Sequence, residues 1–186
     1  ADSTDSYRFA ADYGFSVLAF GRSIPGLREA WTAYQEVASK KAGYEVPFGR
    51  TADGRTLGIM RLTHVADTQE EAEKACREGI NLYFAHLSGA NPNWARKGYL
   101  AADQELTDED ANLDWFDFLQ KHEATLIGSP EDVAEKIEKL RTELNAGHFT
   151  LWPNPVFISF KDVMHSFDLF ASRVMPHFDN DVDKPA

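Results

Sequence analysis

The sequence predicts an α/β protein with a parallel sheet, and three observations lead to this fold class. Short apolar runs that are typical of strands occur at residues 16–20, 56–65 and 148–152. The first of them shows no polar alternation, as expected of a strand that is covered on both faces. Segments with helical periodicity separate these runs, and strands that alternate with helices favour a parallel sheet.

The first predicted helix spans about residues 5–13. Phe9, Ala10 and Tyr13 fall at helical spacing, and we expect them to share one face. Gly14 then supplies the left-handed conformation that commonly ends a helix.

A second amphipathic helix is expected from Pro25 to Gly43, since proline suits a helix start and glycine a helix end. Residues 44–56 are rich in glycine and proline and are predicted to form a loop. A third helix follows, with Asp67 or Thr68 as its N-cap.

The segment 88–121 has no clean periodicity, and we predict an irregular insertion with a functional or interaction role. Regularity returns with a helix that Ser129 caps, that starts at Pro130 and that has Asp132 at capping-box spacing. Gly147 is expected to end this helix.

The last predicted helix runs from Phe160 to about Phe178, and the polar tail 179–186 is expected to be flexible. The residues expected to point inward from this helix are Val163, Met164, Phe167, Phe170 and Val174. Residues 1–186 are predicted to form a single domain, but three strands make a narrow sheet for so many helices. The simplest explanation is that strands are missing.

Composition narrows the class of partner. The formal net charge of −11 disfavours binding to nucleic acid or anionic lipid. Cys76 is the only cysteine, which excludes an internal disulfide and favours a buried thiol in a reducing compartment. No run approaches the length of a membrane span, so we expect a soluble, cytoplasmic protein.

The small polar residues at the start of the chain are the first candidate site. Ser3, Thr4 and Ser6 could bind an anion through their hydroxyls and through the free N–H groups of a helix start. They could also be ordinary helix caps, and their spacing alone favours capping over anion binding. Neighbouring acidic residues oppose an anion, and Arg8 offsets only part of their charge.

Few other residues point to chemistry. None of the six histidines has metal-ligand spacing, so no metal site is predicted, and no dinucleotide fingerprint, P-loop or nucleophile elbow occurs. The acidic stretches 103–110 and 114–117 are typical of a solvated face. Trp152 ends a predicted strand, and ligands of α/β folds bind at the carboxyl ends of strands.

Four segments resemble the luciferase-like flavin-dependent monooxygenases, the family of bacterial luciferase. They are "ADSTDSYRFAADYGFSVLAF", "RLTHVADTQEEAEKA", "LIGSPEDVAEKIEKLRTELNAGHFTLW" and "FDLFASRVMPHF". They follow the family's order and cover nearly the whole chain. The resemblance implies the C-terminal part of a (β/α)8 TIM barrel, about strands six to eight with their helices.

The resemblance also implies a cofactor and its site. The family uses FMN, reduced by a reductase, and O2 to oxygenate a small organic substrate. By this resemblance the cofactor-binding residues are Asp2, Ser3, Thr4, Ser6 and Gly21, and the substrate pocket includes Trp152. The catalytic residues are expected in the N-terminal half of the barrel, which would be the main partner, in the same or a separate chain.

Two other functions stay open at this point. Relatives on the same barrel use a deazaflavin for hydride transfer, and a non-catalytic flavin-binding relative would also keep these segments. The resemblance is compatible with a homo-oligomer. It identifies no substrate.

Overall fold

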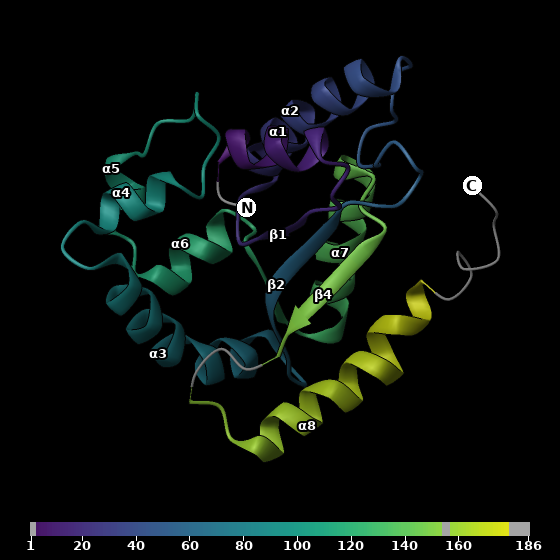
Figure 1. Cartoon of the computed structure of the whole chain (residues 1–186). Coiled ribbons are helices and arrows are strands. Elements are labelled where there is room, and N and C mark those ends of the chain that lie inside the picture. Colours follow the sequence, from purple (N-terminus) through teal and green to yellow (C-terminus); the bar gives the residue numbers. More distant parts are fainter. Residues whose placement is uncertain (1–2, 154–156, 179–186) are drawn as a thin grey trace.

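The computed structural model describes residues 3–153 and 157–178 (Figure 1). Its elements in chain order are α1 (Thr4–Asp12), β1 (Leu18–Phe20), α2 (Ile24–Ala42), β2 (Gly58–Val65), α3 (Gln69–Ser88), α4 (Pro92–Lys97), α5 (Asp108–Asn112), α6 (Trp115–Lys121), β3 (Thr125–Gly128), α7 (Pro130–Leu144), β4 (His148–Trp152), α8 (Phe160–Leu169), the π-helix η1 (Phe170–Val174) and the 3₁₀ helix η2 (Met175–His177). All strand pairs in the sheet are parallel, which confirms the α/β fold class.

β2 is the centre of the sheet. Gly58 pairs with Leu18 of β1 and with His148 of β4, whereas Leu62 pairs with Thr125 of β3 and with Trp152 of β4. A strand residue has only two sides for backbone pairing. β1 and β3 therefore lie one beyond the other on one side of β2, and β4 lies on the opposite side. Within the described residues the outer edges of β1 and β4 have no further strand, so the sheet is open.

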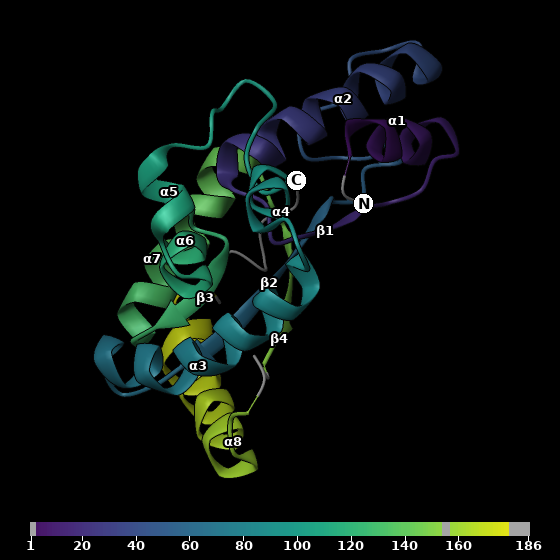
Figure 2. The same ribbon diagram turned by 90° about the vertical axis from the view of Figure 1, so that its left-hand side faces the viewer.

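Both faces of the sheet are covered by helices. Ile59 and Val65 of β2 pack with α1, α2 and α7, and Leu62 packs on the opposite face with α3 and α6. This follows from the alternation of side chains along a strand. Figure 2 shows α3 crossing in front of β2 and β4.

Local signals at the helix ends are confirmed. Gly14 and Gly43 have left-handed φ values of 70° and 78°, as the ends of α1 and α2 require. Thr68 caps α3, and Ser129 and Asp132 form the predicted capping box of α7. Cys76 is buried, and burial raises the pKa of its thiol to about 12, so the thiol is neutral as expected.

The structure adds a strand that the sequence did not indicate. β3 has only four residues, and all of them are buried. Leu126 packs with one hydrophobic cluster and Ile127 with the other. A run this short, covered on both faces, shows no periodicity from which a strand could be inferred.

The expected role of Gly147 is wrong. α7 ends at Leu144, and Asn145 takes the left-handed conformation with φ of 50°. Gly147 does not have a positive φ. A Cβ there would lie 2.7 Å from Cγ2 of Thr56, so glycine is needed for close approach to the 44–56 loop and not for a turn.

The inward faces of the first and last helices also differ from expectation. Phe9 and Tyr13 of α1 are more than half exposed, and Tyr7 is buried instead. In α8, Met164 and Phe167 are 43% and 39% exposed. The hydroxyl of Ser166 accepts the N–H of Val65 at 2.8 Å, which turns another face of α8 toward β2.

The segment 88–121 contains α4, α5 and α6. Its status as an insertion and the single-domain assignment of the chain stay predictions. The predicted flexible tail at 179–186 and Asp2 lie outside the described residues. Across residues 3–153 and 157–178, no helix combines the length and apolar character that crossing a membrane requires.

Candidate functional site

The start of α1 brings the predicted serines together. Ser3 is the N-cap with extended backbone, and its hydroxyl accepts the N–H of Ser6 at 3.3 Å. The two serine Oγ atoms lie 3.1 Å apart. Capping by Ser3 is therefore confirmed, while anion binding stays a prediction.

Free donors remain in the first turn of α1. Within the described residues, the N–H groups of Thr4 and Asp5 have no acceptor. Such groups at a helix start carry partial positive charge and suit an oxyanion. Asp5 opposes this, but Nη1 of Arg8 lies 3.1 Å from its carboxylate and offsets its charge.

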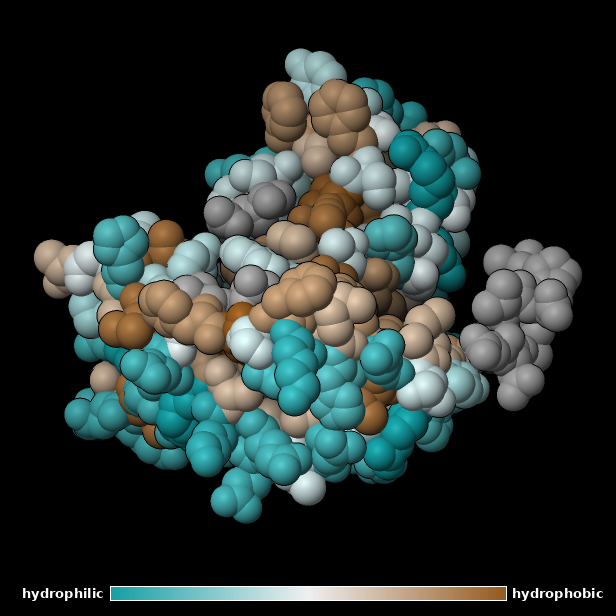
Figure 3. Space-filling model, turned by 90° about the horizontal axis from the view of Figure 1, so that it is seen from below, coloured by the Kyte–Doolittle hydropathy of each residue, from teal (hydrophilic) through white to brown (hydrophobic). Residues whose placement is uncertain are grey.

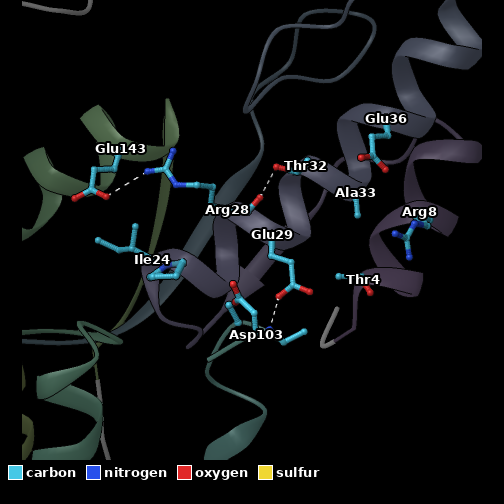
Figure 4. Close-up of a pocket in the computed structure, with 13 residues that line it drawn as sticks. Thr4, Arg8, Ile24, Arg28, Glu29, Thr32, Ala33, Glu36, Asp103 and Glu143 are labelled. Carbon is cyan, nitrogen blue, oxygen red and sulfur yellow. Dashed lines mark hydrogen bonds and ion pairs between the residues drawn. The ribbon is translucent and has the colours of Figure 1, made fainter. Parts of the chain in front are cut away.

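A groove of about 580 Å³ lies beside the start of α1 (Figure 4). Thr4 and Arg8 form one end of it, and α2, residues 101–103 and Glu143 of α7 form the rest. Both arginines that line the groove are ion-paired, Arg28 with Glu143 at 3.3 Å and Arg8 with Asp5 at 3.1 Å. Ser3 and Ser6 stand next to the α1 end of the groove but do not line it.

Gly21 lies directly after β1, with a left-handed φ of 68°. A Cβ at this position would lie 2.9 Å from Cε1 of Tyr99. The backbone of Gly21 is therefore approached closely by an aromatic ring from the 88–121 segment. The family resemblance implied Gly21 as a cofactor-binding residue, which stays a prediction, and did not indicate the ring that approaches it.

Trp152 is part of an aromatic group at the carboxyl ends of two strands. Its ring centroid lies 5.2 Å from that of Phe20, at the end of β1, and 5.9 Å from that of Tyr83 on α3. The group continues through further ring contacts to Phe84, Tyr99, Trp115 and Phe118. Phe84, Trp115 and Phe118 are buried in the core, whereas Phe20, Tyr83, Tyr99 and Trp152 are only partly buried. Partly exposed aromatic rings at this end of a parallel sheet form a suitable wall for a flat, apolar ligand.

Two buried arginines are functional candidates that the sequence analysis missed. Arg61 of β2 is fully buried, and burial lowers the pKa of its guanidinium to about 10. It donates from Nη2 to the carbonyl of Arg22 at 2.7 Å, and Arg22 donates to the carbonyl of Leu100 at 3.0 Å. No ion pair involves Arg61 in the part of the chain that the structure describes. A single arginine within an apolar strand was the only available signal.

In the described ranges no three His, Cys, Asp or Glu side chains are grouped as metal ligands. His64 is buried, and burial lowers the pKa of its imidazole. His165 of α8 bonds to Asp67 at 2.9 Å, which ties α8 to the end of β2.

Parallel strands separated by helices, in a sheet with open edges, are compatible with part of an α/β barrel. The comparison with known families agrees. Residues 1–146 match the model of the luciferase-like monooxygenases, and the chain belongs to this family.

Individual relatives support the same placement. The chain is 26% identical over 179 residues to limonene 1,2-monooxygenase of Rhodococcus erythropolis, covering 94% of the chain and 41% of that protein. Among solved structures it is similar to the oxygenating constituent of 3,6-diketocamphane monooxygenase of Pseudomonas putida in complex with FMN, with a TM-score of 0.62 and 23% identity. It is also similar to the coenzyme F420-dependent tetrahydromethanopterin reductase of Methanopyrus kandleri, with a TM-score of 0.60 and 19% identity.

These matches cover nearly all of this chain but less than half of each structure. The coverage is 92% of the chain against 45% of the diketocamphane enzyme, and 96% against 49% of the reductase. At these identities the structures establish the fold alone. The chain therefore spans under half the length of these three relatives and corresponds to part of a luciferase-like TIM barrel.

Proposed function

We propose that this chain is the C-terminal half of an FMN-dependent monooxygenase barrel that oxygenates a small organic substrate. Family membership supports the reaction class. The start of α1 supports the cofactor, because two adjacent serine hydroxyls and two free N–H groups suit a terminal phosphate. This arrangement is the observation that carries the assignment.

The residues of this chain would bind and shield the cofactor. The N–H groups of the first turn and the hydroxyls of Ser3, Thr4 and Ser6 would donate to phosphate oxygens. Asp2 belongs to the same proposed group. FMN, once reduced by a reductase, supplies the reaction with O2, and the aromatic wall around Trp152 would exclude water from it.

The phosphate assignment predicts a difference between FMN and riboflavin. In the intact protein, replacing Ser3 and Ser6 by Ala should weaken FMN by about 1 to 3 kcal/mol, or roughly 5- to 150-fold, because charge-assisted hydrogen bonds contribute this much. Riboflavin lacks the phosphate, so its affinity should not change. Flavin fluorescence titration measures both dissociation constants.

Two further variants separate binding from capping. Ser6→Ala alone leaves the Ser3 cap in place and should still weaken FMN. Ser172→Ala is a matched control, because its exposed hydroxyl bonds only to the carbonyl of Asp168. Equal losses for FMN and riboflavin would contradict a phosphate site at α1.

A deazaflavin-dependent hydride-transfer enzyme is the second candidate. The similarity to the F420-dependent reductase supports it. The absorbance and mass of the cofactor that copurifies with the protein distinguish the two. A non-catalytic flavin-binding relative would retain the cofactor without oxygenating any substrate.

We also propose that the N-terminal half of a barrel, on the same or another chain, covers the open sheet. The outer edge of β1 is unpaired in the described structure, and next to it Phe9, Tyr13 and Phe15 are each more than half exposed. Their rings contact one another, with centroids 4.6 and 6.0 Å apart. Unpaired edges and exposed aromatic groups favour association.

A second apolar surface lies on α8. Phe160, Met164 and Phe167 are exposed there, and the view from below shows apolar side chains in a band across this face (Figure 3). The missing half would cover this face too.

Charged substitutions at the β1 edge test this assembly. Leu18→Asp and Phe15→Asp should abolish copurification of the two halves when they are expressed as separate chains, because a charge would be buried at the new strand pair. Leu82→Asp is the control, since Leu82 of α3 is 53% exposed and distant in sequence from this edge. Undiminished association of the β1-edge variants would contradict the proposed surface.

A cytoplasmic location, which the single cysteine favours, completes the proposal.

A further inference from the structure

Residues 99–102, which we name the strap, cross the turn between β1 and α2. The N–H of Ser23 donates to the carbonyl of Tyr99 at 2.8 Å. At the other end of the strap, the N–H of Ala102 donates to Oε2 of Glu29 at 2.8 Å, and Figure 4 draws a dashed line from the labelled Glu29. The strap is thus bonded at both ends to residues more than 70 positions earlier in the chain.

Buried arginines fix the middle of the strap. Arg22 donates to the carbonyl of Leu100 at 3.0 Å, and Arg61 donates to the carbonyl of Arg22 at 2.7 Å. Hydrogen bonds between buried charged donors and carbonyls are stronger than ordinary ones. They connect β2, the turn after β1 and the strap in one series.

Two glycines allow the strap to come this close. A Cβ at Gly26, in the first turn of α2, would lie 3.1 Å from the carbonyl oxygen of Tyr99 and 3.2 Å from the carbonyl carbon of Leu100. A Cβ at Gly21 would lie 2.9 Å from the Tyr99 ring. Gly26 has no positive φ, so space and not backbone conformation requires glycine there.

We propose that Tyr99 is a specificity-determining residue for a ligand that binds at the carboxyl end of β1, and that Arg22 and Glu29 are the positioning residues that hold it there. The ring is partly exposed, lies over the backbone of Gly21 and contacts Phe84, Trp115 and Phe118 at centroid distances of 6.1 to 6.2 Å. Its chemistry suits the apolar plane of a flavin ring or of an organic substrate. As far as the flavin is concerned, this rests on the proposed function.

The positioning role is tested by hydrogen exchange in the intact protein. Glu29→Ala removes the acceptor of the Ala102 N–H, so exchange in peptides that cover the strap should become at least about tenfold faster. Glu36→Ala is the matched control, because Glu36 lies on the same helix and lines the same groove but has no described hydrogen bond. Gly26→Ala should also accelerate exchange in the strap. Unchanged exchange in both Glu29→Ala and Gly26→Ala would overturn the positioning role.

The role of Tyr99 in ligand binding is tested with riboflavin, which has the flavin ring but lacks the phosphate. Tyr99→Leu and Glu29→Ala should weaken riboflavin at least fivefold and leave the ratio of FMN to riboflavin affinity unchanged. Faster exchange in Glu29→Ala with unchanged riboflavin affinity in both variants would mean that Tyr99 is only structural. If the wild-type protein binds neither flavin, the proposed function is overturned, and with it the role of Tyr99 in ligand binding. Hydrogen exchange in the strap still decides whether Glu29 holds the strap in place.

Discussion

Gly49→Ala is expected to lower the free energy of unfolding by about 2 to 4 kcal/mol. Gly49 has a left-handed φ of 76°, which costs other residues about 1 to 2 kcal/mol. A Cβ there would also lie 2.7 Å from the carbonyl oxygen of Leu144 and 2.9 Å from that of Asn145. Both atoms belong to the backbone at the end of α7 and cannot rotate away, so overpacking adds about 1 to 3 kcal/mol.

The same loop contains a matched control. Gly54 has a similar φ of 84°, but a Cβ there meets no atom within 4 Å. Gly54→Ala should therefore show only the backbone cost, about 1 to 2 kcal/mol. Urea unfolding of the two variants in the intact protein measures the difference. Equal losses of stability in the two variants would mean that the close contact of Gly49 with the end of α7 does not contribute to the cost of Gly49→Ala.

Asp110→Asn is expected to lower the free energy of unfolding by about 2 to 4 kcal/mol. Asp110 is 3% exposed, and its Oδ2 accepts the hydroxyl of Thr107 at 2.7 Å. Its Oδ1 lies 3.0 Å from Nζ of Lys121 and 3.0 Å from Nε2 of His122. An asparagine would keep the shape of the Asp110 side chain, but it would lose the negative charge that pairs with Lys121 and His122.

The contribution of the Asp110 carboxylate to stability should depend on pH. Burial alone would raise the pKa of Asp110, but hydrogen bonds from Thr107, Lys121 and His122 outweigh it and hold the pKa well below its ordinary value. The unfolded chain therefore binds a proton at this group at higher pH than the folded protein does. The stabilisation is complete above about pH 5 and is lost as the pH falls through about 4 and below.

Comparison of variants isolates this contribution. The stability difference between wild type and Asp110→Asn should be constant from about pH 5 to 7 and should shrink at lower pH. Asp108→Asn is the control, because Asp108 lies in the same short helix without a described side-chain contact, and it should change stability by less than about 1 kcal/mol. A difference that grows toward low pH would contradict the assignment.

This network also shows why the sequence misjudged the acidic stretches. Their composition indicated a solvated face, and most of these residues fit that reading. Asp110 and Asp114 instead hold α5 and α6 through hydrogen bonds, and Arg77 of α3 pairs with Asp114 at 2.8 Å. Arg77 is far from these residues in the chain, so no local pattern predicts the pairing.

The candidate site likewise contains residues that local sequence features predict and residues that they do not. The serines at the start of α1 and Trp152 at the end of β4 were predictable, because a helix cap and a strand end are local features. Tyr99, Arg22 and Arg61 were not, since they become neighbours only when the strap docks on the turn after β1. Gly21 is a site residue only by the family resemblance, which stays a prediction, and nothing in the sequence indicated its aromatic neighbour.

By itself the sequence determined the parallel α/β fold, the ends of α1 and α2, the starts of α3, α7 and α8, and membership in the luciferase-like family. These features depend on neighbours within a few residues, as in the capping box of Ser129 and Asp132. The tertiary structure alone decided the strand β3, the close packing at Gly147 and the position of Tyr99. Each of these depends on contacts between segments distant in the chain, and the free energy of such contacts is not expressed in any local periodicity.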